Sequence, residues 1–363
     1  MGIQRVLISG GGTGGHIYPA IAIASALQEA NPSLEFLFVG AEGKMEMEKV
    51  PKAGFRIIGL PIVGINRQHM WKNLLFPIKL LRSLSKAFAI LKEFKPDLAI
   101  GVGGYASGPM LMAAYVKGIP FVIQEQNSFA GITNKLLSKK AQHIFVAYPG
   151  MEKFFPKEKI KLLGNPVRKD LIESKSKRAQ AAKFFGLDAE KSTVLVIGGS
   201  QGARSINLSI EKGLQELEQA GVQLVWQTGV PFENQAKQAA AKNPSLSSYV
   251  SAFIYEMDLA YAMADIVISR AGALSVSEIC LAGKASVLVP FPNASEDHQT
   301  ENALSLVRQQ AALLVKDNEA QDLLIKTALE TLNNQNLVES LAKASLSMGK
   351  PKAAQEIAAT LLT

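Results

Sequence analysis

The chain has 363 residues, of which 48% are hydrophobic, so it is long and apolar enough to form two domains with separate cores. It contains no run of about 18 apolar residues, which argues against a transmembrane helix. It enters a strand pattern near Val6, so we expect no signal peptide. The single cysteine, Cys280, excludes an internal disulfide and fits a reducing cytosol, and its apolar helical surroundings predict that it is buried.

Charge is distributed unevenly along the chain, which carries a formal net charge of +8. Residues 1–164 hold 20 lysines and arginines against 10 acidic residues, whereas residues 165–363 hold 19 against 21. A strongly basic first half indicates a polyanionic partner, either a membrane surface or nucleic acid. A basic face kept only for solubility is the alternative.

Short apolar runs alternate with helical patterns along most of the chain. In the first half, six runs have the character of strands, at residues 5–9, 34–40, 56–60, 98–102, 121–124 and 143–147. The second half has five such runs, at residues 193–197, 223–227, 266–269, 285–289 and 312–315. This alternation predicts an α/β protein with a doubly wound parallel sheet in each of two domains, residues 1–164 and 165–363. The last helix is a candidate to pack back on the first domain.

A glycine-rich turn, residues 10–15, joins the first strand to the first helix, and His16 follows it directly. Such a turn leaves backbone N–H groups free at the positive end of a helix dipole, which predicts an anion or phosphate site. Gly10, Gly12 and Gly15 also fit the G-x-G-x-x-G dinucleotide fingerprint. That fingerprint needs an acidic residue about 20 positions further on, but Glu29 and Glu35 do not end the second strand, and Glu42, which follows it, lies somewhat far along. A tight turn that binds nothing is the third interpretation.

The basic segment from Arg67 to Lys95 is amphipathic, with seven cationic residues and one acidic residue. At 100° per residue, one face gathers Lys72, Lys79, Arg82 and Lys86. The opposite face gathers Leu74, Ile78, Leu81, Leu84, Phe88 and Leu91, and we expect it to pack on the sheet, with Pro77 in the first turn or at a kink. Residues 70–76 either enter lipid beside anionic headgroups or belong to an ordinary solvated helix.

Further glycine-rich or polar junctions follow other strands, at the edge where open parallel sheets bind ligands. They occur at residues 101–109, 124–128, 198–203, 269–278 and 290–299. For the junction at residues 124–128, capping of the next helix is the alternative.

Two charged residues of the second half are placed to contact a nucleotide. The carboxylate of Glu278 could accept hydrogen bonds from ribose hydroxyls, although a charge near a helix N-terminus also stabilises the helix by itself. Arg168 could reach a diphosphate. The sequence has no metal-binding signature, so we expect neither a metal nor another cofactor. These features favour group transfer from a nucleotide-activated donor, with helix dipoles stabilising the departing diphosphate.

Six motifs carry a resemblance to a known family. They are GGTGGH (11–16), GGY (103–105), EQN with GITN (125–127 and 131–134), GNPVR (164–168), GGSQG (198–202) and GALSVSE (272–278). In this order they resemble the MurG family of peptidoglycan N-acetylglucosaminyltransferases, from residue 4 to about residue 305. The resemblance implies a GT-B fold, in which two Rossmann-like domains face each other across a cleft.

The resemblance also implies an activity. A member of this family transfers N-acetylglucosamine from UDP-N-acetylglucosamine to the 4-hydroxyl of undecaprenyl-diphospho-N-acetylmuramyl-pentapeptide, which converts lipid I to lipid II with inversion at the sugar. It implies a peripheral location on the cytoplasmic face of the cell inner membrane, with the basic first domain toward the anionic leaflet. It places the protein in peptidoglycan synthesis, and so in cell wall biogenesis, cell shape and cell division, and gives it no nucleic-acid partner.

Carried over by position, the resemblance gives a set of substrate-binding residues. These are Thr13, Gly14, Gly15, Asn127, Arg168, Ser200, Ile254, Ala273, Leu274, Ser275, Glu278 and Gln299. Arg168 and Ser200 would hold phosphate, Ile254 would meet uracil through its backbone, and Gln299 would bind the sugar. Residues 273–278 would hold the diphosphate and ribose. Thr13, Gly14, Gly15 and Asn127 would line the first-domain side of the donor site. The donor is nevertheless expected mainly on the second half, with the first glycine turn and His16 facing the acceptor diphosphate.

The acceptor hydroxyl must lose a proton as it attacks the anomeric carbon. Since histidine titrates near pH 7, His16 is the first candidate for the catalytic base. Alternatively, His16 binds the acceptor diphosphate and Glu125 is the base. In a third interpretation, His16 only caps its helix.

Three other functions compete with transfer. A nucleotide-sugar 2-epimerase of the same architecture would need carboxylates around the donor sugar. An NAD-dependent oxidoreductase would need one cofactor fingerprint, whereas both halves carry glycine turns. A non-enzymatic binder of membranes or nucleic acid would not need Arg168, Ser200 and Glu278 together, and an aromatic content of 7% argues against base stacking.

Overall fold

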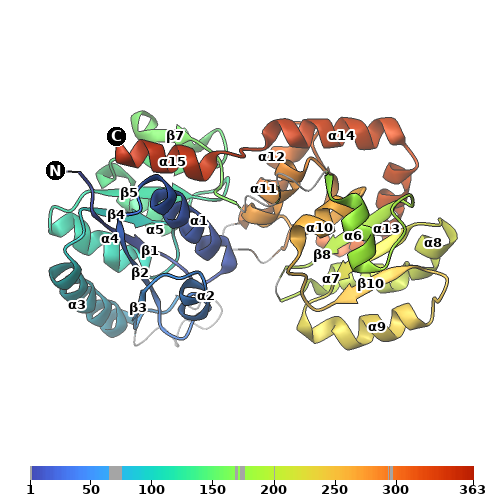
Figure 1. Ribbon diagram of the computed structural model, residues 1–363, viewed down its shortest axis with the longest axis horizontal. Helices are drawn as coiled ribbons and strands as arrows, with labels where there is room; N and C mark the ends of the chain where they lie inside the picture. Colours follow the sequence, from blue (N-terminus) through green and yellow to red (C-terminus); the bar gives the residue numbers. More distant parts are fainter. Residues whose placement is uncertain are drawn as a thin grey trace. The chain divides into compact units, whose positions relative to one another are not determined.

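The computed structural model describes residues 2–64, 76–167, 171, 176–199, 201–292, 294 and 297–363 (Figure 1). The chain forms two compact units. The first comprises Met1–Val167 together with Lys352–Thr363, and the second comprises Arg168–Pro351. The end of the chain therefore belongs to the unit in which the chain begins.

The first unit is built on a seven-stranded sheet in the order β3-β2-β1-β4-β5-β6-β7, and every neighbouring pair is parallel. Its strands are β1 (Arg5–Ser9), β2 (Glu35–Ala41), β3 (Ile57–Leu60), β4 (Leu98–Gly101), β5 (Phe121–Glu125), β6 (Ile144–Val146) and β7 (Ile160–Leu162). Its α-helices are α1 (Gly14–Ala30), α2 (Glu46–Lys52), α3 (Phe76–Phe94), α4 (Ser107–Val116), α5 (Ile132–Leu137) and α15 (Ala353–Leu362).

Alternate residues of β1 face two separate cores. Val6 and Ile8 pack in a cluster that includes residues of α1, α2 and α15, whereas Leu7 packs in a cluster with residues of α3, α4 and α5. Figure 1 shows α15 beside α1, and the buried residues Ile357 and Leu361 join α15 to this core. Since side chains of a strand alternate between the two faces, helices cover both sides of the sheet.

The second unit has a six-stranded parallel sheet in the order β10-β9-β8-β11-β12-β13. Its strands are β8 (Thr193–Ile197), β9 (Gln223–Gln227), β10 (Ser248–Ser251), β11 (Ile266–Ser269), β12 (Ala285–Leu288) and β13 (Leu313–Leu314). Its α-helices are α6 (Arg178–Phe185), α7 (Arg204–Lys212), α8 (Leu214–Gln219), α9 (Glu233–Ala241), α10 (Met257–Met263), α11 (Ala273–Ala282), α12 (His298–Val307), α13 (Ala320–Leu332) and α14 (Gln335–Met348). The predicted α/β class with two doubly wound parallel sheets is confirmed.

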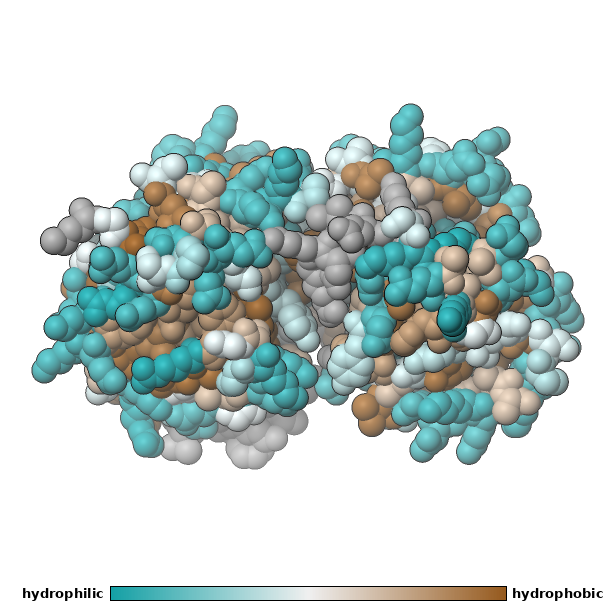
Figure 2. All heavy atoms as spheres, in the orientation of Figure 1, coloured by the Kyte–Doolittle hydropathy of each residue, from teal (hydrophilic) through white to brown (hydrophobic). Residues whose placement is uncertain are grey.

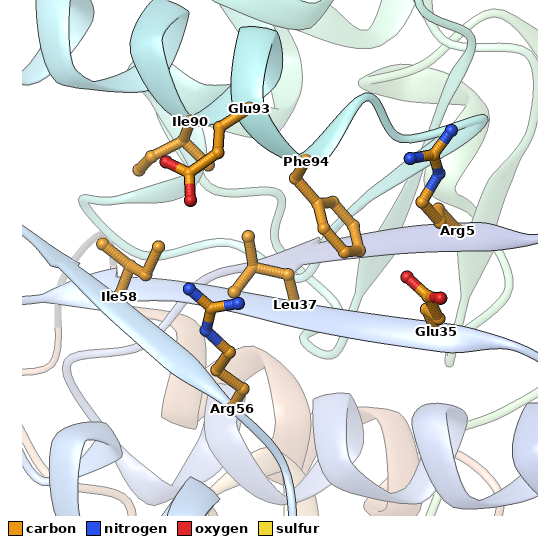
Figure 3. Close-up of a pocket in the computed structure, with 8 residues that line it drawn as sticks. All are labelled: Arg5, Glu35, Leu37, Arg56, Ile58, Ile90, Glu93 and Phe94. Atoms are coloured by element: carbon orange, nitrogen blue, oxygen red, sulfur yellow. The ribbon is translucent and has the colours of Figure 1, made fainter.

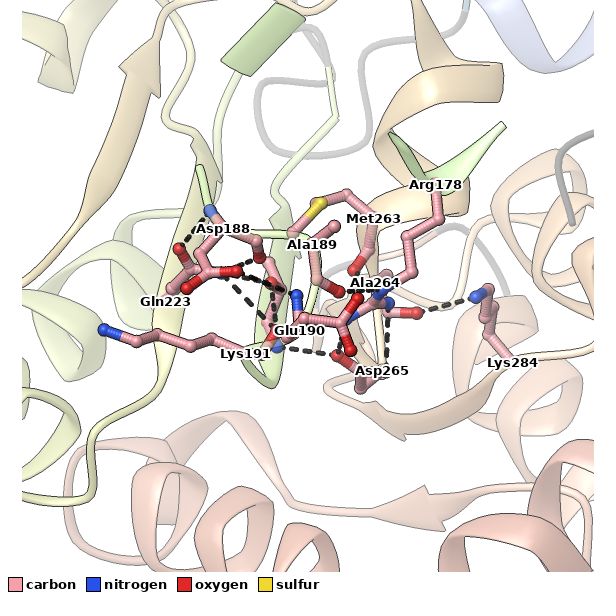
Figure 4. Close-up of polar contacts among 11 residues, drawn as sticks. Arg178, Asp188, Ala189, Glu190, Lys191, Gln223, Met263, Ala264, Asp265 and Lys284 are labelled. Carbon is pink, nitrogen blue, oxygen red and sulfur yellow. Dashed lines mark hydrogen bonds and ion pairs between the residues drawn. The ribbon is translucent and has the colours of Figure 1, made fainter. Parts of the chain in front are cut away.

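In both sheets, an aspartate before one central strand accepts hydrogen bonds from backbone N–H groups at the start of the neighbouring strand. Asp97, just before β4, accepts hydrogen bonds from the backbone N–H groups of Arg5 (2.8 Å) and Gln4 (2.9 Å), which lower the pKa of its carboxyl group. Asp265, just before β11, accepts from the Thr193 N–H (2.8 Å). It also pairs with Arg178 (3.0 Å), as Figure 4 shows. These aspartates lie at the opposite strand ends from the glycine turns.

Some sequence expectations need correction. The amphipathic pattern predicts that Ile78 and Leu81 of α3 pack on the sheet, but these residues are 55% and 67% exposed. The buried face of α3 is formed by Ser83, Ala87, Ile90 and Leu91. Strands β7 and β10 were not predicted, because each is short and neither is rich in buried apolar residues. Residues 65–75, which include Lys72 and Leu74, lie outside the described part of the chain.

Two other expectations are confirmed: α3 begins at Phe76, which places Pro77 in its first turn, and Cys280 is buried. None of the helices in the described ranges is long and apolar enough to cross a membrane.

Candidate functional site

The first glycine turn requires glycine for reasons of both backbone conformation and space. Gly11 and Gly12 have φ values of +145° and +91°, which L side chains rarely adopt. A Cβ at Gly10 would overlap the side chain of Val102 and the carbonyl oxygen of Gly103. The turn is therefore shaped by its neighbours in the fold as well as by its own sequence.

A second glycine turn, after β4, packs directly on the first. Gly103 and Gly104 also have positive φ values, +86° and +83°. The Gly11 N–H donates to the Gly103 carbonyl (3.3 Å), and a Cβ at Gly104 would overlap the Gly11 carbonyl oxygen. Since β1 and β4 are neighbours, both turns lie at the carboxyl edge of the sheet. Backbone contact of this kind leaves no room for a side chain.

The buried carboxylate of Glu46, which is 1% exposed, completes the first turn from inside the unit. Its two oxygens lie 3.1 Å and 3.0 Å from the Gly12 nitrogen, and Oε1 also accepts from the Ala41 N–H (3.0 Å). The N–H groups of Gly10, Gly11 and Gly12 are thus all used within the protein. The anion site predicted for the turn as a whole does not extend to these three groups.

The next three N–H groups have no such partner. Among the described residues, no acceptor is seen for the backbone N–H groups of Thr13, Gly14 and Gly15, at the start of the 17-residue helix α1. Thr13 is exposed, and Gly14 and Gly15 are half-buried. A helix of this length presents a positive dipole end there, so this part of the turn can accept a phosphate or another anion.

His16 lies in the first turn of α1, at the rim of the same region. Its Nδ1 is 2.8 Å from Oε1 of Gln126, which follows β5. The ring also packs against Gly103, because a Cβ there would lie 3.1 Å from Cε1 and 3.3 Å from Nδ1 of His16. The imidazole is therefore held in place by a hydrogen bond and by a glycine backbone.

Glu125, the other candidate base, is surrounded by donors. Its Oε1 accepts from the backbone N–H (3.1 Å) and the side-chain amide (3.4 Å) of Asn127. Its Oε2 accepts from the Gly131 N–H (3.0 Å) and from Asn134 Nδ2 (2.8 Å). The carboxylate is 2% exposed, so it organises the loop between β5 and α5 and has little room to take a proton from a substrate.

In the second unit, the loop between β8 and α7 is held against the loop after β9. Gly202 has a φ of +75°, and a Cβ on it would overlap the Thr228 carbonyl oxygen. Gln227 joins this region to Ile254: its Nε2 donates to the Gly199 carbonyl (3.3 Å) and its Oε1 accepts from the Ile254 N–H (3.0 Å). No donor to the Ile254 carbonyl is seen among the described residues, so this oxygen can receive a hydrogen bond from a ligand.

The predicted ribose and diphosphate residues lie on helix α11, directly after β11. Ala273, Leu274 and Ser275 form its first turn, and Gly272 precedes it in an extended conformation. Glu278 lies one turn further on, with its Oε2 3.4 Å from the hydroxyl of the buried Tyr261. The positive end of the helix dipole and one carboxylate thus lie on neighbouring turns of α11.

Arg270 anchors the loop between β11 and α11 through residues that are distant in the sequence. Its guanidinium group donates to the carbonyls of Val289 (3.1 Å) and Pro290 (3.2 Å) and to Ser205 Oγ (2.9 Å), and it pairs with Asp317. It ties the ends of β11 and β12 to the start of α7.

The remaining predicted residues are placed as follows. Gln299, in the first turn of α12, accepts a hydrogen bond from the Phe291 N–H through its Oε1 (3.0 Å). Arg168 and Ser200 lie outside the described residues. Over the described ranges, no group of three or more histidine, cysteine, aspartate or glutamate side chains could hold a metal ion.

A small cavity of about 150 Å³ lies away from these turns, at the amino ends of β1 and β2 beneath α3 (Figure 3). It is lined by Arg5, Glu35, Leu37, Arg56, Ile58, Ile90, Glu93 and Phe94. Ligands of open α/β sheets bind at the carboxyl ends of the strands. We therefore place the candidate site at the glycine turns and not in this cavity.

Models of two families match the chain. The glycosyltransferase family 28 N-terminal domain matches residues 6–146, and the glycosyltransferase family 28 C-terminal domain matches residues 193–357. A protein of Bacteroides fragilis named UDP-N-acetylglucosamine--N-acetylmuramyl-(pentapeptide) pyrophosphoryl-undecaprenol N-acetylglucosamine transferase is 53% identical over 98% of this chain and 94% of its own length. A protein of Cytophaga hutchinsonii with the same name is 52% identical over 97% of this chain and 95% of its own.

Solved structures with a similar fold cover nearly the whole chain. MurG of Acinetobacter baumannii superposes with a TM-score of 0.81 at 30% identity, covering 99% of both chains. The UDP-GlcNAc 2-epimerase of Neisseria meningitidis superposes with a TM-score of 0.69 at 16% identity, covering 99% of this chain and 100% of its own, which shows a shared fold only.

Proposed function

This chain belongs to glycosyltransferase family 28, and we propose that it transfers N-acetylglucosamine from UDP-N-acetylglucosamine to undecaprenyl-diphospho-N-acetylmuramyl-pentapeptide. The observation that carries the proposal is the identity of about half of all residues, over nearly the full length of both chains, to proteins named for this reaction. The product is the disaccharide lipid known as lipid II, from which peptidoglycan is built, so the enzyme serves cell wall synthesis, cell shape and division.

The donor nucleotide is assigned to the second unit. The Ile254 carbonyl, which no described residue uses, is suited to accept a hydrogen bond from the uracil ring N–H. The positive dipole end at the start of α11 suits the diphosphate, and the carboxylate of Glu278 is assigned to the ribose hydroxyls. Arg168 and Ser200 are assigned to phosphate and Gln299 to the sugar.

The acceptor is assigned to the first unit. The free N–H groups of Thr13, Gly14 and Gly15 suit its diphosphate, because they combine backbone donors with the dipole of a long helix. Asn127, which donates to Glu125 in the loop after β5, is also assigned to substrate binding in this unit.

In the reaction, the 4-hydroxyl oxygen of the acceptor attacks the anomeric carbon of the donor sugar from the face opposite UDP. The new glycosidic bond forms as the bond to UDP breaks, and UDP leaves with the bonding electron pair. His16 takes the hydroxyl proton, since its imidazole is held in place at the rim of the anion site. Glu125 is the weaker candidate for the base, because all its hydrogen bonds are directed at its own loop.

We further propose that the face formed by α3, α4 and α5 meets an anionic membrane surface, on the cytoplasmic side of the inner membrane. Helices α3 and α4, and α4 and α5, are in contact. Figure 2 shows apolar residues on the surface of the first unit between polar side chains. The large apolar side chains that α3, α4 and α5 expose are Ile78, Leu81, Met112, Tyr115, Val116, Ile132 and Leu136. Lysines accompany them, such as Lys140 over the ring of Tyr115 at 4.9 Å, and this combination is typical of interfacial binding.

Incubation with radiolabelled UDP-N-acetylglucosamine and a lipid I analogue tests the activity. We expect label in the lipid product together with one UDP per transfer. Release of labelled N-acetylmannosamine or its nucleotide would instead indicate an epimerase, and absence of turnover with tight vesicle binding would indicate a non-enzymatic surface protein. An oxidoreductase would be revealed by a change in nicotinamide absorbance in a parallel reaction.

A further inference from the structure

We propose that Gln126 is a positioning residue that holds the His16 imidazole in one tautomer, with the proton on Nδ1 and the lone pair on Nε2. The proposal rests on the proposed function only in the role that it gives to Nε2, which is to accept the proton of the acceptor hydroxyl. The tautomer itself follows from hydrogen bonds within the first unit.

A chain of hydrogen bonds among buried amides has only one possible direction. It starts at the backbone carbonyl of Gln126, which can only accept and receives Asn165 Nδ2 at 2.9 Å. The Oδ1 of Asn165 is then the atom that faces Gln124, whose Nε2 donates to it at 3.1 Å. This leaves Oε1 of Gln124 to accept from Nε2 of Gln126. The positions of the oxygen and nitrogen atoms in each side-chain amide therefore follow from those in the preceding amide. None of them has to be assigned independently.

The chain ends at His16. The Gln126 Nε2 also donates to the Val102 carbonyl at 2.8 Å, so a reversed Gln126 amide would bring two oxygens together. The Oε1 of Gln126 is therefore the atom that lies 2.8 Å from His16 Nδ1. Because an amide oxygen carries no proton, Nδ1 must be the donor, and Nε2 of the neutral ring keeps its lone pair.

Burial makes this arrangement hard to reverse. The side chains of Gln124, Gln126 and Asn165 are each 3% exposed or less. Reversing one amide would leave buried donors and acceptors without partners, which costs more than in water. The contact of the His16 ring with Gly103 further limits its rotation. Gln126 is uncharged, so it orients the imidazole without placing a counter-charge beside it.

Nuclear magnetic resonance of the full chain with ¹⁵N-labelled histidine reads the tautomer directly. The chain has four histidines, so four pairs of ring nitrogens are expected, and the His16→Asn variant identifies those of His16. At a pH where the ring is neutral, we expect a protonated Nδ1 and an unprotonated Nε2. A proton on Nε2 in the wild-type protein overturns the proposal, whatever the enzyme's activity.

Variants of Gln126 separate orientation of the ring from a purely structural role. Gln126→Leu removes the acceptor, so we expect a mixture of tautomers and a fall in kcat of about 10²-fold, with the KM for the acceptor little changed. Gln126→Glu keeps an oxygen facing Nδ1 but loses the donors to Val102 and Gln124. We expect it to retain the Nδ1–H tautomer and more activity than Gln126→Leu. If both variants keep the wild-type tautomer and lose activity equally, Gln126 is structural and the proposal fails.

Gln223→Leu is the matched control, since Gln223 is also 1% exposed and bonds to backbone groups, but in the second unit. It should lower stability without changing the His16 ring signals. If the tautomer is as expected but His16→Ala keeps full activity, the assigned role of Nε2 is overturned while the hydrogen-bond assignment stands. The two failures are thereby distinguishable.

Discussion

His16 is the residue on which the proposed chemistry depends most. It directly follows Gly14 and Gly15 in the first turn of α1, where an acceptor diphosphate would bring the reacting hydroxyl near. We expect His16→Ala to lower kcat by about 10²-fold or more, the usual effect of losing a general base. Steady-state assays with a lipid I analogue measure this. His143→Ala is the control and should leave kcat unchanged, because His143 lies just before β6, at the amino end of that strand. Wild-type turnover in His16→Ala would exclude a catalytic role.

Cys280 illustrates a residue whose chemistry is suppressed by its surroundings. Burial in α11 raises the pKa of its thiol to about 11, because the thiolate would lose its hydration. At pH 8 only about one thiol in 10³ is then ionised, and the side chain is also sheltered from reagents. We expect labelling by iodoacetamide to be at least about 10²-fold slower in the native protein than in denaturant. Mass spectrometry after timed labelling measures both rates, and rapid native labelling at pH 8 would contradict the burial.

At the scale of secondary-structure elements, the two glycine turns of the first unit are structurally coupled, because their backbones are in direct contact. Gly104→Ala adds a methyl group that would overlap the Gly11 carbonyl, so the turn that carries His16 must shift. Gly54→Ala is the matched control, since its φ of +86° is close to the +83° of Gly104 and a Cβ there meets no atom within 4 Å.

Gly54→Ala should destabilise the protein by only about 1–2 kcal/mol, the cost of a left-handed conformation. Gly104→Ala should cost more and should also abolish most transferase activity. Chemical denaturation and the transferase assay measure the two effects. Equal losses of stability in the two variants, with activity kept in both, would show that the contact between the turns is unimportant.

The elements show what the sequence can and cannot reveal. Most strands, the glycine turns and the helix starts at Gly14 and Ala273 follow local rules of periodicity and turn chemistry, so their places along the chain are predictable. The role of Glu46 is not predictable in this way, because its partner Gly12 lies 34 residues away and the sequence around Glu46 resembles an ordinary helix start.

The direction of the Gln124–Gln126–Asn165 network has the same long-range origin. The exposure of Ile78 and Leu81 has a related cause. An amphipathic pattern shows that a helix has two faces, but the packing of its neighbours decides how much of each is covered.

At the scale of the whole molecule, the end of the chain stabilises its beginning. Ile357 of α15 is fully buried in the core that it shares with α1, so Ile357→Ala should cost about 2–5 kcal/mol. Leu362→Ala is the control, because Leu362 is 37% exposed and should matter little. Hydrogen exchange followed by mass spectrometry resolves the effect. Protection should fall in β1 and β4 but not in β8 and β11, and a loss confined to the second unit would contradict the assignment of α15 to the first.

The charge of the molecule is concentrated in the first half, where the proposed membrane face also lies. Each cation near an anionic surface contributes about 1 kcal/mol, so reversing both Lys79 and Arg82 should weaken binding to anionic vesicles by about 30-fold or more. Salt should weaken the wild-type interaction in the same direction, since the attraction is screened.

The matched control reverses Lys242 and Lys343, which are exposed in the second unit and change the net charge by the same amount. Vesicle co-sedimentation at several salt concentrations compares the three proteins. If the control loses as much binding as the α3 variant, the interaction depends on net charge alone.

Leu136→Ser tests the apolar contribution to membrane binding. Leu136 is 75% exposed on α5, so its replacement should weaken binding even at high salt. Binding that is unchanged by Leu136→Ser, by salt and by charge reversal on α3 would exclude this face as the membrane surface.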